Sequence, residues 1–172
     1  GKIGDLSEGA ARPDHFDGML TVVAKLFDAV KPRYAVFGAK DAQQVFLVKQ
    51  MAAQKFPELE VIVAPTIREA NGLAMSSRNR YLTEADHKVA EQISAALRAG
   101  TDSVSQGGSP QQALEAARTA MAKAPEAKLD YIALVEADTF EAVSDGFTGR
   151  AILLIAAVVG ETRLIDNIEI TF

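Results

Sequence analysis

Three polar segments of this 172-residue chain carry the residue types that can do chemistry. The first is Gly38-Ala39-Lys40-Asp41. Glycine lets a ligand approach the backbone, lysine supplies a mobile cation, and the N-terminus of a following helix offers oriented N–H donors. Together these groups suit an anion or a nucleotide. An ordinary strand-to-helix turn with Asp41 as N-cap explains the same residues, and spacing alone leaves both interpretations open.

The second segment spans residues 66–80 and contains Met75-Ser76-Ser77-Arg78-Asn79. Two hydroxyls and a guanidinium bind phosphate oxygens through charge-assisted hydrogen bonds, although in isolation a solvated polar loop is the plainer interpretation. The segment reads as irregular, with a turn at Asn71-Gly72, and it has one acid, Glu69, against three arginines. These arginines are Arg68, Arg78 and Arg80. Two phosphate-compatible loops on either side of a hinge near Pro65 would close on one triphosphate, so we expect this arginine cluster to face phosphates.

The third segment is Arg12-Pro13-Asp14-His15-Phe16. A lone histidine is more often a capping or structural residue than a catalyst, although its pKa suits acid–base work. The only other histidine, His87, is distant in the sequence, and there is no cysteine. Zinc ribbons, iron–sulfur clusters and thiol nucleophiles are therefore excluded.

Composition narrows the function classes further. The net charge of −5 and the sequence pI near 5.1 argue against nonspecific nucleic-acid binding, which rests on Lys and Arg. The longest apolar run, at 151–160, is the length of a strand, so no membrane span is expected. We expect no signal peptide, and the lack of cysteine is compatible with the reducing cytoplasm. Because the chain opens on Gly1 rather than Met, we expect that something upstream has been removed.

The elements that must position these segments form two groups. The first group alternates helix and strand, and its predicted elements are 16–30, 34–38, 41–56 and 59–64. The two strands are continuous apolar runs, typical of strands buried on both faces of a parallel sheet. Ligands bind at the carboxyl ends of such strands, which is where residues 38–41 lie.

The second group has two helices and then three strands. A Thr83 cap with Asp86 begins the first helix, and Ser109-Pro110 begins the second. The predicted strands are 129–135, 150–159 and 163–171, with a tight hairpin at Glu161-Thr162. This order predicts a small α+β domain with a three-stranded antiparallel sheet. We expect Asp166-Asn167 to be structural, in the last strand or a bulge.

Four motifs in order carry a resemblance that covers the chain from end to end. ARPDHF, FGAKDAQQ, LAMSSRNRYL and RLIDN resemble the pattern of the pantothenate synthetase (pantoate:β-alanine ligase) family. The resemblance implies that residues 1–66 are the C-terminal half of a Rossmann-like parallel α/β nucleotidyltransferase domain. Residues 67–172 would then be a small α+β domain that acts as a lid.

The resemblance also implies an activity. The family joins pantoate to β-alanine with ATP and Mg²⁺ through a pantoyl adenylate, releasing AMP and pyrophosphate, and its members are expected to be cytoplasmic homodimers. The implied ATP-binding residues are Gly38, Ala39, Lys40, Asp41, Ile67, Met75, Ser76, Ser77 and Arg78. Among these, Gly38 and Asp41 resemble ribose contacts, and Ile67 should lie by the adenine. Lys40 and residues 75–78 resemble the phosphate contacts. Gln44 resembles a pantoate-binding glutamine, and Arg12 and His15 would border the cleft.

The chain departs from the family pattern in three ways. Ala39 stands where the family often has Glu or Gln, and Ala42 where it usually has an aromatic residue. The paired-histidine motif H-x-G-H occurs nowhere in this sequence, so we assign no catalytic residue and expect the chain alone to be inactive. Two other interpretations remain: a noncatalytic nucleotide- or phosphate-binding module completed by a partner chain, and a purely structural or interaction domain with an exposed sheet edge.

Overall fold

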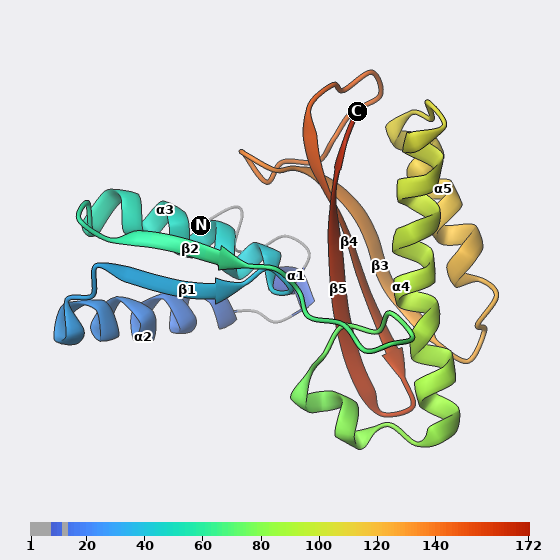
Figure 1. Ribbon diagram of the computed structural model, residues 1–172, viewed down its shortest axis with the longest axis horizontal. Coiled ribbons are helices and arrows are strands. Elements are labelled where there is room, and N and C mark those ends of the chain that lie inside the picture. The colour runs from blue at the N-terminus through green and yellow to red at the C-terminus, as the bar shows by residue number, and fades with distance from the viewer. Residues whose placement is uncertain (1–7, 12–13) are drawn as a thin grey trace. The chain divides into compact units, whose positions relative to one another are not determined.

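The computed structural model describes residues 8–11 and 14–172, and the chain divides into two units, Gly1–Pro65 and Thr66–Phe172. The first unit alternates helices and strands (Figure 1). Its elements are α1 (Glu8–Ala11), α2 (His15–Val30), β1 (Tyr34–Gly38), α3 (Ala42–Lys55) and β2 (Glu60–Ala64). β1 and β2 are parallel, in register from Tyr34 opposite Glu60 to Gly38 opposite Ala64, and α3 is the crossover between them.

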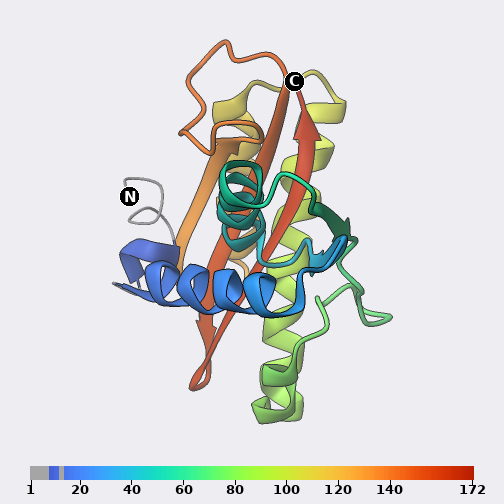
Figure 2. The same ribbon diagram turned by 90° about the vertical axis from the view of Figure 1, so that its left-hand side faces the viewer.

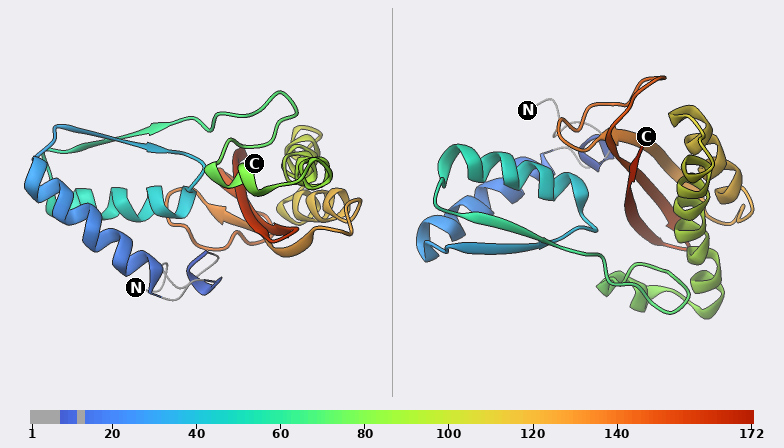
Figure 3. Two further views of the ribbon diagram at one scale, coloured as in Figure 1. Left: turned by 90° about the horizontal axis from the view of Figure 1, so that it is seen from below. Right: turned by 45° about the horizontal axis from the view of Figure 1, so that its top comes forward.

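Both long helices of the first unit pack on the same face of its two strands (Figure 3). Phe27 of α2 and Val48 and Met51 of α3 form the buried centre of this packing. Alternate strand residues, such as Phe37 and Val61, meet them from the sheet. The apolar spacing of α2 predicts an inner face that includes Leu20, Val23 and Phe27, and these three residues lie in this packing. The same spacing includes Leu26 and Val30, which are exposed.

The opposite face of the same sheet is open, which corrects the prediction that both faces are buried. Val36 is 65% exposed, and Ile62 is also exposed. A parallel sheet is buried on both faces only when helices cover both, and in the described part of this unit the two long helices share one face.

The second unit is an antiparallel sheet covered on one face by two helices (Figure 1 and Figure 2). The strand order is β3-β4-β5. The elements are η2, a 3₁₀ turn (Ser77–Tyr81), α4 (Glu84–Ser105), α5 (Pro110–Met121), β3 (Lys128–Glu136), β4 (Arg150–Val159) and β5 (Thr162–Thr171). The α/β fold class and the three-stranded second part are as predicted. No helix in the described residues is long and apolar enough to cross a membrane.

The hairpin between β4 and β5 turns one residue earlier than predicted. Val159 pairs with Thr162, so the two-residue turn is Gly160-Glu161. Gly160 has φ +56°, and the first position of a type II′ turn is one that favours glycine. The need for a positive φ, rather than the polarity of Glu161-Thr162, therefore sets the turn.

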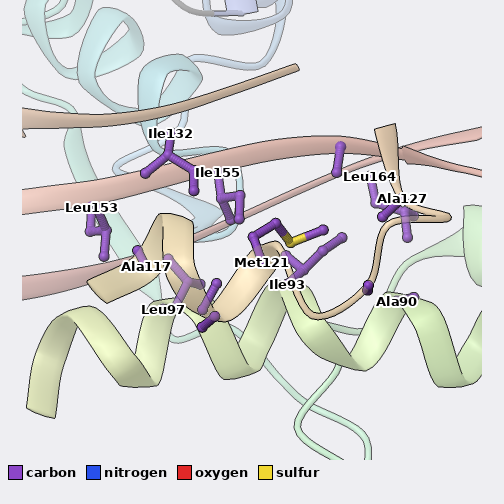
Figure 4. Close-up of a cluster of buried hydrophobic side chains, with 14 of the residues drawn as sticks. Ala90, Ile93, Leu97, Ala117, Met121, Ala127, Ile132, Leu153, Ile155 and Leu164 are labelled. Atoms are coloured by element: carbon purple, nitrogen blue, oxygen red, sulfur yellow. The ribbon is translucent and has the colours of Figure 1, made fainter. Parts of the chain in front are cut away.

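The core of the second unit lies between its helices and its sheet. Figure 4 shows Ile93 and Leu97 of α4 and Met121 of α5 gathered against the strand residues Leu153 and Ile155. Close packing here depends on Gly100 of α4: a Cβ at this position would lie 2.5 Å from Leu153 Cδ2 and 3.3 Å from the Ala113 carbonyl oxygen.

Both helices of the second unit begin where predicted, and each begins with a capping box, of which only the one at Thr83 is part of the prediction. Thr83 Oγ1 accepts from the Asp86 N–H at 3.1 Å, and the Asp86 carboxylate accepts from the Thr83 N–H at 3.1 Å and from the Thr83 hydroxyl at 2.7 Å. Ser109 and Gln112 repeat the reciprocal arrangement at α5. The hydrogen bond from the Thr83 side chain, then that from its backbone, holds the pKa of the Asp86 carboxyl below its ordinary value.

We expect Gly100→Val to destabilise the second unit by about 2 kcal/mol, since overpacking a close helix contact forces side chains and backbone apart. Urea unfolding followed by far-UV circular dichroism measures the change. Gly18→Ala in α2 is the control, because a Cβ there meets nothing within 4 Å, and it should stabilise its helix by up to about 1 kcal/mol. An unchanged urea midpoint for Gly100→Val would show that this glycine is not needed for close packing.

We expect the Asp86 carboxyl to titrate below the ordinary aspartate value of about 3.9. A lowered folded-state pKa contributes stability above the unfolded-state pKa, and this contribution is lost as the pH falls through the folded-state value. Side-chain ¹³C NMR titration measures the midpoint, which Thr83→Val should raise. Thr21→Val removes a hydroxyl bonded within α2 and should leave Asp86 unchanged. Equal Asp86 midpoints in the wild type and Thr83→Val would contradict the capping explanation.

Candidate functional site

The segment Gly38–Asp41 lies at the carboxyl ends of both strands of the first unit. Gly38 is the last residue of β1, and the Ala39 N–H donates to the Ala64 carbonyl at the end of β2 at 2.8 Å. The Asp41 N–H donates to the Gly38 carbonyl at 3.4 Å, and α3 begins at the next residue. Lys40 lies half-buried within this turn. The predicted strand–turn–helix arrangement is therefore present.

The glycine in this turn is not explained by the packing of the chain itself. Among the described residues, a Cβ on Gly38 would meet nothing within 4 Å, and Gly38 does not have a positive φ. Asp41 occupies the N-cap position as predicted, yet its carboxylate makes no capping hydrogen bond. Two residues of the turn thus have the types that a ligand site uses, without the local structural roles that would account for them.

The two glutamines at the start of α3 differ in their surroundings. Gln43 is buried, and its Oε1 accepts from the Glu8 N–H of α1 at 3.1 Å. Gln44 is half-buried on the neighbouring position of the same turn. The structure therefore gives Gln43 a role in holding α1, a role that the sequence QQ does not reveal.

The third predicted segment is described only in part. His15 is the first residue of α2, half-buried, with its ring centroid 5.3 Å from that of Phe16. Asp14 before it has φ 61°. Arg12 lies outside the described residues.

In the second unit, the segment predicted to be irregular contains a short hairpin. The Met75 N–H donates to the Ile67 carbonyl at 2.9 Å, and Arg68 and Ala74 form an antiparallel bridge. The Gly72 N–H donates to the Glu69 carbonyl at 2.9 Å, with Gly72 at φ 92°, so the turn predicted at Asn71-Gly72 is present. The hairpin brings together Ile67 and Met75, two predicted nucleotide contacts, and both side chains are exposed.

The serine and arginine residues of the next turn combine a structural role with available polar groups. Ser76 is the N-cap of η2, and its Oγ accepts from the Arg78 N–H at 3.2 Å. An accepting hydroxyl still has its own proton to donate. Ser77 and Arg78 are exposed, and Arg78 Nη1 donates to the Arg163 carbonyl at 3.5 Å. This turn can therefore offer hydroxyl donors and a guanidinium to an anion.

The expectation that all three arginines face phosphates is wrong for Arg68. Its guanidinium donates from Nη1 to Asp166 Oδ2 at 2.6 Å and from Nη2 to Asp166 Oδ1 at 3.1 Å. Asp166 lies in β5 as predicted and is only 3% exposed, so its charge requires this partner. Arg80 lies over the ring of Tyr81, 5.1 Å from its centroid. The sequence signal for this pairing is the carboxylate of Asp166 within an apolar strand, because a buried carboxylate needs a cationic partner.

The described part of the chain contains no cluster of side chains that could coordinate a metal ion. There, no three His, Cys, Asp or Glu side chains gather closely enough to hold an ion. Mg²⁺ at nucleotide sites keeps several waters and binds substrate phosphates with one or two carboxylates.

Nearly the whole chain matches a protein family. A family model described as pantoate-beta-alanine ligase matches residues 1–169. The chain belongs to this family. The pantothenate synthetase of Leifsonia xyli subsp. xyli is 49% identical over 171 residues, which are 99% of this chain and 59% of the relative. That of Acidothermus cellulolyticus is 48% identical over 170 residues, which are 97% of this chain and 56% of the relative. The chain thus spans a little over half the length of these curated relatives.

Solved structures of family members share the fold. The pantothenate synthetase of Thermus thermophilus has a TM-score of 0.95 at 43% identity, covering 100% of this chain and 62% of that one. The pantoate-beta-alanine ligase of Francisella tularensis, solved with beta-gamma ATP and beta-alanine, has a TM-score of 0.69 at 36% identity, covering 97% and 55%. These likenesses confirm the predicted fold class and the predicted family.

Proposed function

We propose that this chain acts in the ATP-dependent condensation of pantoate with β-alanine, and that residues of both units bind ATP. The observation that carries the proposal is the turn after β1. In a chain of this family, Gly38 and Asp41 lie at a strand end without local structural roles that account for them. Strand ends of parallel α/β units are where such folds bind ligands.

The reaction requires two displacements. A pantoate carboxylate oxygen attacks the α-phosphorus of ATP, and the bond to the β-phosphate oxygen breaks, giving pantoyl adenylate and pyrophosphate. The amine of β-alanine then attacks the acyl carbon, a C–N bond forms, the C–O bond to AMP breaks, and the amine gives up a proton. Negative charge on the phosphates must be held in both steps, so oriented cations and N–H donors carry much of the catalysis.

Residues of the first unit would bind the ribose, a phosphate and pantoate. Lys40 supplies a cation beside the N-terminus of α3, where the helix dipole favours negative charge. Gly38 and Ala39 leave room for the nucleotide at the backbone, and the uncapped carboxylate of Asp41 can accept from ribose hydroxyls. Gln44, which is not the glutamine that holds α1, would bind pantoate. His15, with Arg12, would border the cleft.

Residues of the second unit would bind the adenine and the remaining phosphates. Ile67 and Met75 are exposed and joined by a backbone hydrogen bond, so an adenine contact and the start of the phosphate loop are held together. Ser76, Ser77 and Arg78 would hold the phosphates and the leaving pyrophosphate, with the Ser76 hydroxyl oriented by the N–H of Arg78. The same proposal includes Mg²⁺ bound with ATP, a homodimer and a cytoplasmic location, which the family resemblance implies.

A noncatalytic nucleotide-binding module is the second candidate, favoured by one observation. The sequence contains two histidines, His15 and His87, and no H-x-G-H motif. Such a module would bind ATP through the same residues and rely on a partner chain for the chemistry.

We expect Lys40→Ala and Ser76→Ala each to weaken ATP binding by about tenfold or more, because each removes a charge-assisted hydrogen bond to a phosphate. Titration of the full chain with ATP, followed by ¹H–¹⁵N NMR, measures the dissociation constant. Ser76→Asp separates two roles: aspartate keeps an N-cap acceptor for η2 but repels phosphate, so it should bind ATP more weakly than Ser76→Ala.

The matched controls are Lys49→Ala, an exposed lysine on α3, and Ser144→Ala, an exposed serine between β3 and β4. Both should bind ATP as the wild type does. If Lys40→Ala and Ser76→Ala also match the wild type, the assignment of the ATP residues is wrong.

We expect the chain alone to form no pantothenate above the enzyme-free rate from pantoate, β-alanine and ATP, because the paired histidines are absent from its sequence. Mass spectrometry of the product and of the intact chain measures this. Turnover at an ordinary rate by this polypeptide would mean that the histidines are dispensable.

Sequencing the DNA upstream of the Gly1 codon separates the two candidates. A continuous reading frame that encodes H-x-G-H supports the ligase, and a start codon next to Gly1 supports the noncatalytic module.

A further inference from the structure

The hairpin of residues 67–75 combines buried and exposed side chains. Arg68 and Ala74 are bridge partners, and both are at least partly buried. Ile67 and Met75 are the next residues along each arm, and their side chains are exposed. The proposed nucleotide contacts are therefore exposed, while the neighbouring arginine is directed at the sheet.

That arginine fastens the hairpin to β5. Besides its two bonds to the Asp166 carboxylate, the Arg68 guanidinium donates to the Gly72 carbonyl at 3.1 Å and to the Asn167 carbonyl at 3.3 Å. A single side chain thus closes the hairpin turn and ties it to a strand 98 residues away in the sequence. The guanidinium has little donor capacity left for a phosphate.

A buried asparagine of η2 holds this turn, which carries the proposed phosphate contacts, against the same hairpin. Asn79 of η2 is 7% exposed. Its Nδ2 donates to Glu69 Oε1 at 2.7 Å and to the Ala74 carbonyl at 3.1 Å. Since Ser76 and Arg78 belong to the turn that Asn79 holds, the hairpin and the turn behave as one body attached to β5 through Arg68.

We propose that the Arg68–Asp166 pair, together with Asn79, is a positioning device that presets Ile67 and residues 75–78 for a nucleoside triphosphate without touching it. This inference rests on the proposed ATP site. A loop that is ordered before binding spares the ligand the entropy of ordering it, so the device acts on affinity through the backbone. Pairing also removes the cost of a buried, unpartnered carboxylate.

The variants that test this positioning role are Asp166→Asn, which keeps the size of the side chain, and Arg68→Lys, which keeps its charge. Both lose the bidentate hydrogen bonding between guanidinium and carboxylate. The double variant Arg68→Met with Asp166→Leu removes both charges. It is expected to remain folded, since buried ion pairs are often replaceable by apolar residues, so it tests the loss of the pair without unfolding. Asp138→Asn is the control, because it breaks another Arg–Asp pair of this unit, with Arg150, that does not contact the hairpin.

The first measurement is amide hydrogen exchange of the full chain without nucleotide. The informative amides are those of Met75 and Glu69, which donate to the Ile67 and Leu73 carbonyls. Their exchange should be roughly tenfold faster or more in the Asp166 and Arg68 variants, while amides between β4 and β5 remain protected. Unchanged exchange at Met75 and Glu69 overturns the inference.

The second measurement is a double-mutant cycle in ATP affinity. Asp166→Asn should weaken ATP binding by about tenfold in the wild type and much less in an Arg78→Ala background, because the pair acts through the turn that carries Arg78. An equal loss in both backgrounds indicates a general effect on folding and overturns the inference. If Ser76→Ala weakens ATP binding and Asp166→Asn does not, the positioning role alone fails. If the wild type shows no ATP response, the proposed function fails, and this inference fails with it.

Discussion

The buried carboxylate of Asp166 is the constraint on which the second unit depends. It lies in β5 between the core residues Leu164 and Ile168, where an unpaired charge would be costly. Its partner, Arg68, comes from the start of the same unit, and its side chain retains 29% exposure. Satisfying one charge in the strand therefore ties the segment from residue 67 to residue 75 to β5, together with the burial of Leu73 and Ala74.

Much of the fold follows from local sequence signals, and apart from the one-residue shift of the β4–β5 turn, the misses are features that depend on distant packing. The capping boxes at Thr83 and Ser109 are encoded within four residues, so the helix starts are predictable. Val36 and Ile62 are apolar, and a run of apolar residues predicts burial on both faces, yet these two side chains are exposed. Residue type indicates what a face can bury and does not indicate whether anything covers it.

The candidate site shows the same limit in finer detail. The sequence identifies the residue types that can bind a ligand. It does not show which of two residues of the same type binds the ligand and which one stabilises the fold. Arg68 and Arg78 lie in one polar segment, and the difference between them is that Arg68 pairs with the buried carboxylate of Asp166, whereas Arg78 is exposed. Gln43 and Gln44 are neighbours, and the Glu8 backbone makes the first structural. In both cases the deciding partner is 35 or more residues away, beyond the reach of a motif.

Three other glycines show why Gly38 supports a ligand site. Gly72 and Gly160 have positive φ values, and a Cβ at Gly100 would collide with Leu153, so each is required by its own chain. Gly38 meets neither condition. It lies at a strand end, in front of the N-terminus of α3 and beside an N-cap aspartate that does not cap. A glycine that neither the backbone nor the packing demands, in the place where parallel strands end, supports the proposal of a ligand that approaches the backbone closely.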